Sequence, residues 1–190
     1  MLQFITAKLS AGALIVSQLL LTAVVGTDPY FQDVSLDVRG DRLFYSAVLA
    51  ESFTPDMDVL LQSGDTVTIH FELDLVNTET NQVAAMANWD HQFIYSILED
   101  EYTVHKSESR RTFHSYDFEE AKREWVLISD ALFCRLEVME DQHPYSLRIS
   151  AYMDEMELPG MSEQVNLMAY WNRIRPVHIS EPFMKRQLEQ

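Results

Sequence analysis

The sequence contains little cysteine, glycine or positive charge, and each shortage excludes some classes of function. Cys134 is the only cysteine among 190 residues, so no intrachain disulfide forms, which is ordinary for a bacterial envelope protein. The five glycines form no glycine-rich phosphate loop, and the G-x-S-x-G pattern of a nucleophilic serine is missing. Lys and Arg number 14 against 30 Asp and Glu, giving a formal charge of -16. This balance argues against nucleic acid and anionic lipid surfaces as partners.

The first 26 residues have the layout of an export signal. Lys8 is their only charged side chain, and an uncharged, mostly apolar run from Leu9 to Val25 leads to Gly26. A basic start, an apolar centre and small residues before a cut at Thr27 are typical of a cleaved signal peptide. The run also approaches the ~20 residues of a spanning helix, so an uncleaved N-terminal membrane anchor stays open. With either outcome we expect a periplasmic or otherwise extracytoplasmic protein, secreted or tethered by this segment.

Beyond this segment the dominant signal is alternation of apolar and polar side chains, which is typical of half-buried strands. Residues 34–38 and 42–49 flank Gly40-Asp41 and predict a β-hairpin. Residues 66–76 predict a long strand with one apolar face. The other expected strands are 89–98 paired with 102–105, 132–138 paired with 145–153, and 165–171.

Two short helices are predicted at connections between strands. Thr54 and Asp117 are good N-cap residues, because the oxygen of each side chain can accept from a free backbone N–H of the first turn. We therefore expect a mostly β protein, an antiparallel β-sandwich of about seven or eight strands with two short connecting helices. The length fits a single domain over 27–183, followed by a polar C-terminal tail over 184–190.

Several short patterns occur in an order that resembles a known family. Residues 93–104 hold one tyrosine early and a second after a short turn, and residues 118–121 place Phe before an acidic-Ala step. A late strand ends at Leu158-Pro159. From about Leu43 to Trp171 this order resembles an uncharacterised family of exported bacterial proteins, catalogued as domain of unknown function 4390. The resemblance implies export and a shared fold, and it implies no reaction.

Two features depart from that family. Its members usually carry a basic, Trp-rich stretch after the long strand, whereas residues 77–88 contain no basic residue and no Trp here and carry only one charge, on Glu79. Its closing segment typically holds two tryptophans close together, whereas here only Trp171 is present. If those positions form the family's interaction surface, this chain has lost or replaced it.

Candidate metal ligands are scattered along the chain. Six histidines form no H-x-H or H-x-x-x-H pair, and no cysteine cluster supports zinc. His70, Glu72 and Asp74 share a strand face that a neighbouring strand could complete with His91, but alternating charge is also normal for a solvated face. The acidic groups at strand ends lack the spacing of an EF-hand loop; they are Glu99-Asp100-Glu101, Glu140-Asp141 and Asp154-Glu155 with Glu157.

No catalytic, cofactor-binding or metal-binding residue is assigned, and no cofactor is expected. Cys134 lies in the middle of an expected strand, where it is a small hydrophobic residue and not an activated nucleophile. The aromatic residues are expected to fill the core, although an exposed Trp89 would mark a contact surface.

The leading hypothesis is a non-enzymatic envelope domain that binds another envelope protein, through a sheet edge or an outer strand face. The alternative is a sandwich that binds a small ligand or carbohydrate between its sheets or at their rim. An unrecognised hydrolase would need titratable groups that converge in a cleft. Contact with a membrane is expected only through an uncleaved N-terminal segment.

Overall fold

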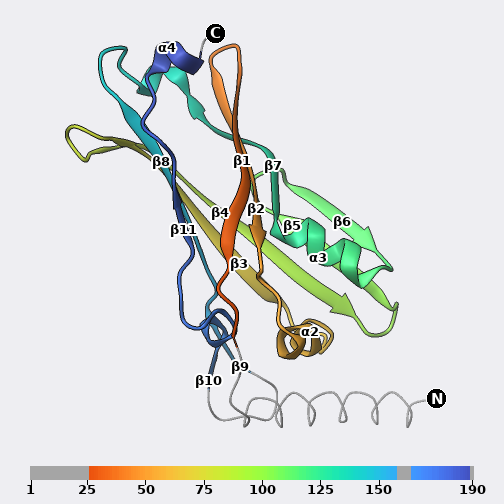
Figure 1. The fold of residues 1–190 in the computed structure, drawn as a ribbon. Coiled ribbons are helices and arrows are strands. Elements are labelled where there is room, and N and C mark those ends of the chain that lie inside the picture. Colours follow the sequence, from red (N-terminus) through yellow and green to blue (C-terminus); the bar gives the residue numbers. More distant parts are fainter. Residues whose placement is uncertain (1–25, 158–163, 189–190) are drawn as a thin grey trace, which may run out of the picture.

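A computed structural model describes residues 26–157 and 164–188. Within them the strands are β1 (Tyr30–Arg39), β2 (Arg42–Ala50), β3 (Val67–Asn77), β4 (Val83–Ser96), β5 (Glu101–Lys106), β6 (Arg111–Ser115), β7 (Leu127–Arg135), β8 (Tyr145–Tyr152), β9 (Glu155–Glu157), β10 (Gln164–Asn166) and β11 (Val177–Ile179). They form a six-stranded sheet in the order β11-β8-β3-β4-β5-β6, a three-stranded sheet in the order β1-β2-β7, and the pair β9–β10. The small sheet lies against one face of the large sheet (Figure 1). The prediction of a mostly β, antiparallel sandwich is confirmed, with more strands than the seven or eight expected.

The first hairpin forms where the sequence predicts it. Arg39 pairs with Arg42 across the turn at Gly40-Asp41. Gly40 has a φ of +65°, a left-handed conformation that glycine adopts without a steric penalty. Alternate residues of β2, from Leu43 to Leu49, are buried against the large sheet.

Strand β3 forms the centre of the large sheet. Its side chains from Val67 to Leu75 alternate between buried and half-buried, as the sequence predicts. It pairs antiparallel with β4 on one side and β8 on the other, so that Phe71 lies opposite both Trp89 and Ala151. Full burial of a side chain such as Phe71 contributes about 1.5–3 kcal/mol to folding.

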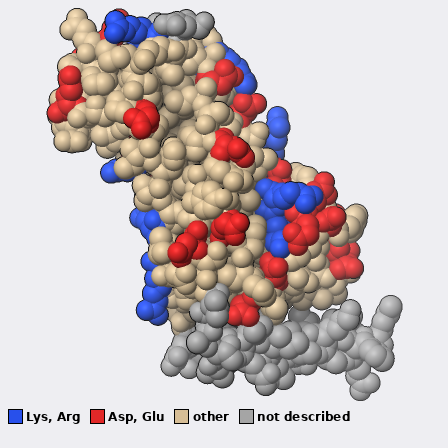
Figure 2. All heavy atoms as spheres, viewed as in Figure 1, with Lys and Arg blue, Asp and Glu red and all other residues tan. Residues whose placement is uncertain are grey.

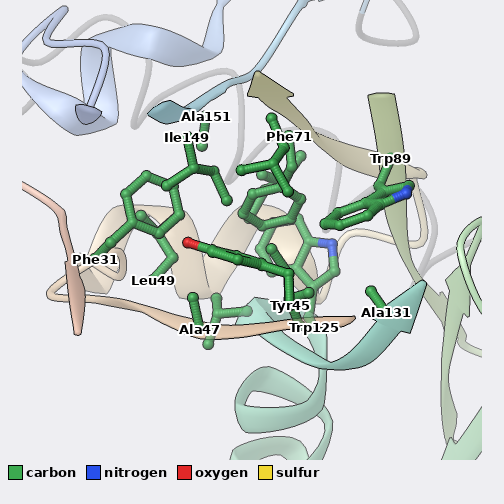
Figure 3. Close-up of a cluster of buried hydrophobic side chains, with 14 of the residues drawn as sticks. Phe31, Tyr45, Ala47, Leu49, Phe71, Trp89, Trp125, Ala131, Ile149 and Ala151 are labelled. Carbon is green, nitrogen blue, oxygen red and sulfur yellow. The ribbon is translucent and has the colours of Figure 1, made fainter. Parts of the chain in front are cut away.

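Aromatic side chains from both sheets meet in the core (Figure 3). The ring of Tyr45 on β2 lies 6.3 Å from that of Trp89 on β4, and the Phe31 ring on β1 lies 6.3 Å from that of Phe71. Trp89 is 5% exposed, so it belongs to the core and marks no contact surface. The Tyr45 hydroxyl points toward Phe31 and Leu49 (Figure 3) and has no hydrogen-bond partner in the part of the chain that the structure describes.

Both predicted helices are present with their predicted N-caps. In α2 (Pro55–Leu61) the Thr54 hydroxyl accepts from the Met57 N–H at 3.1 Å. In α3 (Phe118–Val126) the Asp117 carboxylate accepts from the Glu120 N–H at 2.9 Å. Helix α3 connects the last strand of the large sheet to β7 of the small sheet and buries Trp125.

Two strands were missed or shortened by the sequence-based prediction. β4 begins at Val83, six residues before the expected start at Trp89. The polar connection after β5 contains β6, which pairs with β5 so that His105 and Thr112 lie opposite each other. Backbone pairing and polar contacts hold this strand: His105 Nδ1 lies 2.9 Å from the Thr112 hydroxyl. Hydrophobic alternation carries little signal for a strand of this kind.

The predicted pairing of 132–138 with 145–153 is wrong. β7 pairs with β2 in the small sheet, whereas β8 pairs with β3 and β11 in the large sheet. β7 also begins earlier and ends at Arg135, where a 3-10 turn, η1 (Leu136–Val138), replaces the expected end of the strand.

The expected strand over 165–171 is also wrong for most of its length. Only its first residues belong to β10, and Leu167–Trp171 form a 3-10 helix, η2. The Asn166 side chain caps this turn by accepting from the Met168 N–H at 3.0 Å. The 3-10 geometry lets Leu167, Tyr170 and Trp171 all reach the core, which an alternating strand would not allow.

The expected signal or anchor over residues 1–25 and the Leu158-Pro159 step lie outside the described residues. In the expected C-terminal tail, Lys185–Leu188 form a short helix, α4. None of the helices within 26–157 and 164–188 has both the length and the apolar content needed to cross a bilayer.

Candidate functional site

The polar face of β3 is a set of ion pairs and histidine–carboxylate contacts. His70 Nδ1 lies 2.8 Å from Asp90 and its Nε2 lies 3.0 Å from Asp154. Asp74 accepts from Arg148 at 2.6 Å, and Glu72 pairs with Arg175. Each of these groups is therefore matched by a partner on a neighbouring segment.

His91 does not join that face. His70 lies opposite Asp90 in the pairing of β3 with β4, so the next residue, His91, points to the opposite side and is fully buried. The hypothetical site that combined His70, Glu72 and Asp74 with His91 is therefore not formed. Among the described residues, no group of three His, Cys, Asp or Glu side chains could hold a metal ion.

The other candidates are also separated in the fold. The acidic groups lie at three different connections: between β4 and β5, between β7 and β8, and between β8 and β9. Cys134 is half-buried on β7, and burial raises the pKa of its thiol to about 11. The thiol is therefore protonated at neutral pH, as expected for a structural cysteine.

His91 instead forms a buried bridge that sequence reasoning missed. Its Nδ1 lies 2.6 Å from the Trp125 carbonyl oxygen, and its Nε2 lies 3.1 Å from Glu108 Oε1. Trp125 Nε1 in turn donates to the His91 carbonyl oxygen at 2.7 Å. These contacts tie β4 to the turn after β5 and to the end of α3. A signal was available, because His91 has the same strand parity as the buried Trp89 and Phe93.

The bridge carries charge. Burial alone raises the pKa of Glu108, but the hydrogen bond and positive charge of His91 outweigh it and hold the pKa below its usual value. The Glu108 carboxylate and the Trp125 carbonyl are both acceptors, and each lies within hydrogen-bond distance of one nitrogen of the His91 ring. The Glu108 side chain is only 2% exposed, and its second oxygen, Oε2, has no hydrogen-bond partner among the described residues.

Glu108 also lines a cleft of about 480 Å³ on one side of the sandwich, here called the β6–β7 cleft. The β5–β6 hairpin, the end of α3 and the edge of β7 enclose it. Lys106 Nζ spans part of this space, donating to Glu124 at 2.5 Å and to the Leu127 carbonyl oxygen at 2.8 Å. Arg39 at the rim pairs with Asp130 at 2.7 Å.

A second hollow, of about 510 Å³, lies along the other side and is here called the β1–β11 groove. Residues 31–36 of β1 form one wall, and residues 178–181 form the other, with Leu147 of β8 between them. Asp33 and Glu181 are its two acidic side chains, and none of the described residues that line it is Lys or Arg. The surface over β1 is mostly uncharged, with scattered acidic side chains (Figure 2).

Three of the four edges of the two main sheets carry features that discourage the addition of another strand. β1 is bulged between Gln32 and Ser35. β7 has shifts in register, and its Leu127 carbonyl is bound by Lys106. β6 is five residues long and begins with Arg111. Bulges, charge and short length all discourage pairing at an edge.

The edge of β11 is short, but its register with β8 is continuous and it carries no charge. The Ala151 N–H donates to the Pro176 carbonyl, and the Ser180 N–H donates to the Leu147 carbonyl. Because hydrogen-bonded and non-hydrogen-bonded residue pairs alternate along an antiparallel ladder, the backbone N–H and C=O groups of Val177 and Ile179 point away from β8. Both side chains are exposed, at 53% and 62%.

The fold and its two lateral hollows define a two-layer β-sandwich with an open edge at β11. The chain belongs to the family described as "Domain of unknown function (DUF4390)", whose sequence model matches residues 29–173. The predicted membership is thus confirmed over a longer stretch than expected. No curated protein and no solved structure matches the chain.

One departure from the family has a structural counterpart. Trp171, the single tryptophan of the closing segment, is fully buried, and its Nε1 donates to the Ser52 carbonyl oxygen at 2.9 Å. In this chain the position therefore stabilises the core and offers no surface for a partner.

Proposed function

We propose that this chain is an exported protein-interaction module that binds an extended segment of another envelope protein by strand addition at β11. The observation that carries the proposal is the outer edge of β11, which pairs with no second strand within residues 26–157 and 164–188, and where the backbone groups of Val177 and Ile179 point away from β8. An added strand would satisfy these groups, and main-chain hydrogen bonds supply much of the affinity in this mode of recognition.

The adjoining groove supplies a basis for specificity. In an added strand, alternate side chains point into the space between the sheets. There they would meet Phe31, Leu36 and Leu147. We therefore expect apolar residues at alternate positions of the bound segment.

Charge favours a basic partner. The groove presents Asp33 and Glu181 without a lining Lys or Arg, and the whole chain has a formal charge of -16. Lys or Arg residues flanking the apolar positions would find complementary charge, which increases the rate of association and selects among partners. Location in the envelope rests on the N-terminal export pattern and on the family resemblance.

The test is in-cell crosslinking of a C-terminally tagged copy with a photoreactive residue at His178, read by mass spectrometry. Ile179→Pro removes the outward N–H, whereas Ile179→Val keeps both the N–H and an apolar side chain. We expect the same extended segment of one envelope protein to be recovered with the parent and Ile179→Val, and to be lost with Ile179→Pro.

Two results would contradict the proposal. One is recovery of the segment with Ile179→Pro at the level of Ile179→Val, which would show that the free N–H is not used. The other is the absence of any partner crosslinked at this position in cells that fold and export the protein.

A further inference from the structure

The β6–β7 cleft is lined by equal numbers of basic and acidic side chains. Its basic residues are Arg39, Lys106 and Arg111, and its acidic residues are Glu108, Glu124 and Asp130. Such a lining attracts neither an anion nor a cation strongly, because each charge on a ligand would meet both signs. From this lining we propose that the cleft binds a neutral, hydroxyl-rich ligand of the saccharide class.

Most of these charges already have partners. Arg39 pairs with Asp130, and Lys106 pairs with Glu124. Glu108 uses only Oε1, toward His91. Pairs of this kind hold the walls in place, and they explain why the cleft shows no free acid and base that would indicate a hydrolase.

Two unused groups remain that a ligand hydroxyl can satisfy. Glu108 Oε2 lacks a hydrogen-bond partner although the side chain is 2% exposed. Arg111 is the one lining cation without a carboxylate partner among the described residues. A sugar hydroxyl both donates and accepts, so one ligand can donate to Glu108 and accept from Arg111. A buried acceptor left without a donor is costly, and a ligand hydroxyl that donates to Glu108 would remove this cost.

The remaining lining suits the apolar face of a sugar ring. Phe113 on β6 is half-buried and lines the cleft together with Val104 and Leu132. An aromatic ring beside a few fixed polar groups is the usual composition of a small-ligand site, and a volume of about 480 Å³ lies in the range of such sites. This site is on the opposite side of the sandwich from the β1–β11 groove.

The test is an NMR titration of the ¹⁵N-labelled full chain with three sugars that differ in charge: glucose, glucosamine and glucuronate, with cellobiose as a longer neutral probe. Each is added to concentrations on the order of 10 mM, because single-sugar binding is weak. We expect glucose and cellobiose to shift the amide signals of Ser109, Arg111 and Phe113, and the two charged sugars to bind less tightly.

The variants are matched neighbours. Arg111→Gln removes the unpaired cation of the cleft, and Arg110→Gln removes the adjacent cation, which does not line it. Loss of a hydrogen bond to a charged group predicts roughly tenfold weaker binding of cellobiose for Arg111→Gln and no change for Arg110→Gln.

Three results would overturn the proposal. The first is no shift with any sugar. The second is tighter binding of glucosamine or glucuronate than of glucose at these residues. The third is an equal loss of cellobiose binding in Arg111→Gln and Arg110→Gln.

Discussion

The two open sides of the sandwich differ in the charge of the residues that line them. Along the β1–β11 groove the described lining residues are a mixture of apolar and uncharged polar side chains with two carboxylates, Asp33 and Glu181. Along the β6–β7 cleft, ion pairs such as Lys106–Glu124 connect strand, helix and strand. The comparison shows that a sandwich can have openings of similar volume on its two sides and still line one with few charges and the other with ion pairs.

Each side also holds one buried polar atom without a partner. The Tyr45 hydroxyl lies in the core and points toward Phe31, which lines the groove. Glu108 Oε2 belongs to a residue that lines the cleft. Burying an unpartnered hydroxyl costs less than burying an unpartnered carboxylate, and the Glu108 carboxylate is bonded by His91 through its other oxygen.

The largest expected effect is therefore on the cleft side. Glu108→Ala leaves the His91 ring buried without its carboxylate, and breaking a buried pair in this way costs about 3–5 kcal/mol. Chemical denaturation followed by tryptophan fluorescence measures the free energy of unfolding. The matched control is His70→Ala on the outer face, whose partners Asp90 and Asp154 are exposed and whose loss costs about 1 kcal/mol or less. Equal costs for the two variants would contradict the account.

The next effect tests the edge of β11. His178→Pro removes a ladder N–H that faces Ile149 of β8 and is expected to cost about 1–3 kcal/mol. Ile179→Pro removes only the outward N–H and is expected to cost less than about 1 kcal/mol. Thermal unfolding of both variants distinguishes them, and a larger cost for Ile179→Pro would show that this N–H is already used.

A smaller effect concerns the core behind the groove. Tyr45→Phe removes a hydroxyl that makes no hydrogen bond, so we expect unchanged stability or a gain of up to about 1 kcal/mol. Tyr145→Phe is the control, because the Tyr145 hydroxyl accepts from the Glu140 N–H at 3.0 Å and its loss costs about 1 kcal/mol. A clear loss of stability in Tyr45→Phe would mean that the hydroxyl has a partner.

The last expected effect is a dependence of stability on pH that arises from Glu108 in the cleft. The pKa of Glu108 in the folded protein lies below its ordinary value of 4.5, so the folded state binds fewer protons than the unfolded state in this range. Its contribution to stability is complete above pH 4.5 and is lost as the pH falls through the folded pKa. The difference in unfolding free energy between the parent and Glu108→Gln should shrink on acidification. A constant difference would contradict this.

The sequence predicted the elements whose signal lies in neighbouring residues, such as an alternating strand or a capped helix. The alternation from Val67 to Leu75 gave the inner face of β3, and Thr54 and Asp117 gave the starts of both helices. These features depend on the two-residue alternation of a strand, or on a side chain that caps the backbone a few residues away. β6 was missed because its contacts are not local: its polar residues depend on β5.

Long-range pairing was the part that the sequence could not supply. Whether β7 pairs with β8 or with β2 depends on how the whole chain packs, and the alternation within each strand is the same in both cases. The burial of Glu108 likewise depends on His91, 17 residues away. The alternation of Trp89, His91 and Phe93 along the strand indicates that His91 points inward. Its partner, Glu108, could be identified only from the fold.

The most direct test of the central claim is hydrogen exchange at the β11 amides. In the free chain, the account predicts fast exchange at Val177 and Ile179 and slow exchange at His178. Addition of a synthetic peptide with the crosslinked segment's sequence should slow exchange at Val177 and Ile179. Slow exchange at all three amides in the free chain, or no change when the peptide binds, would contradict the claim that this edge is free and receives a strand.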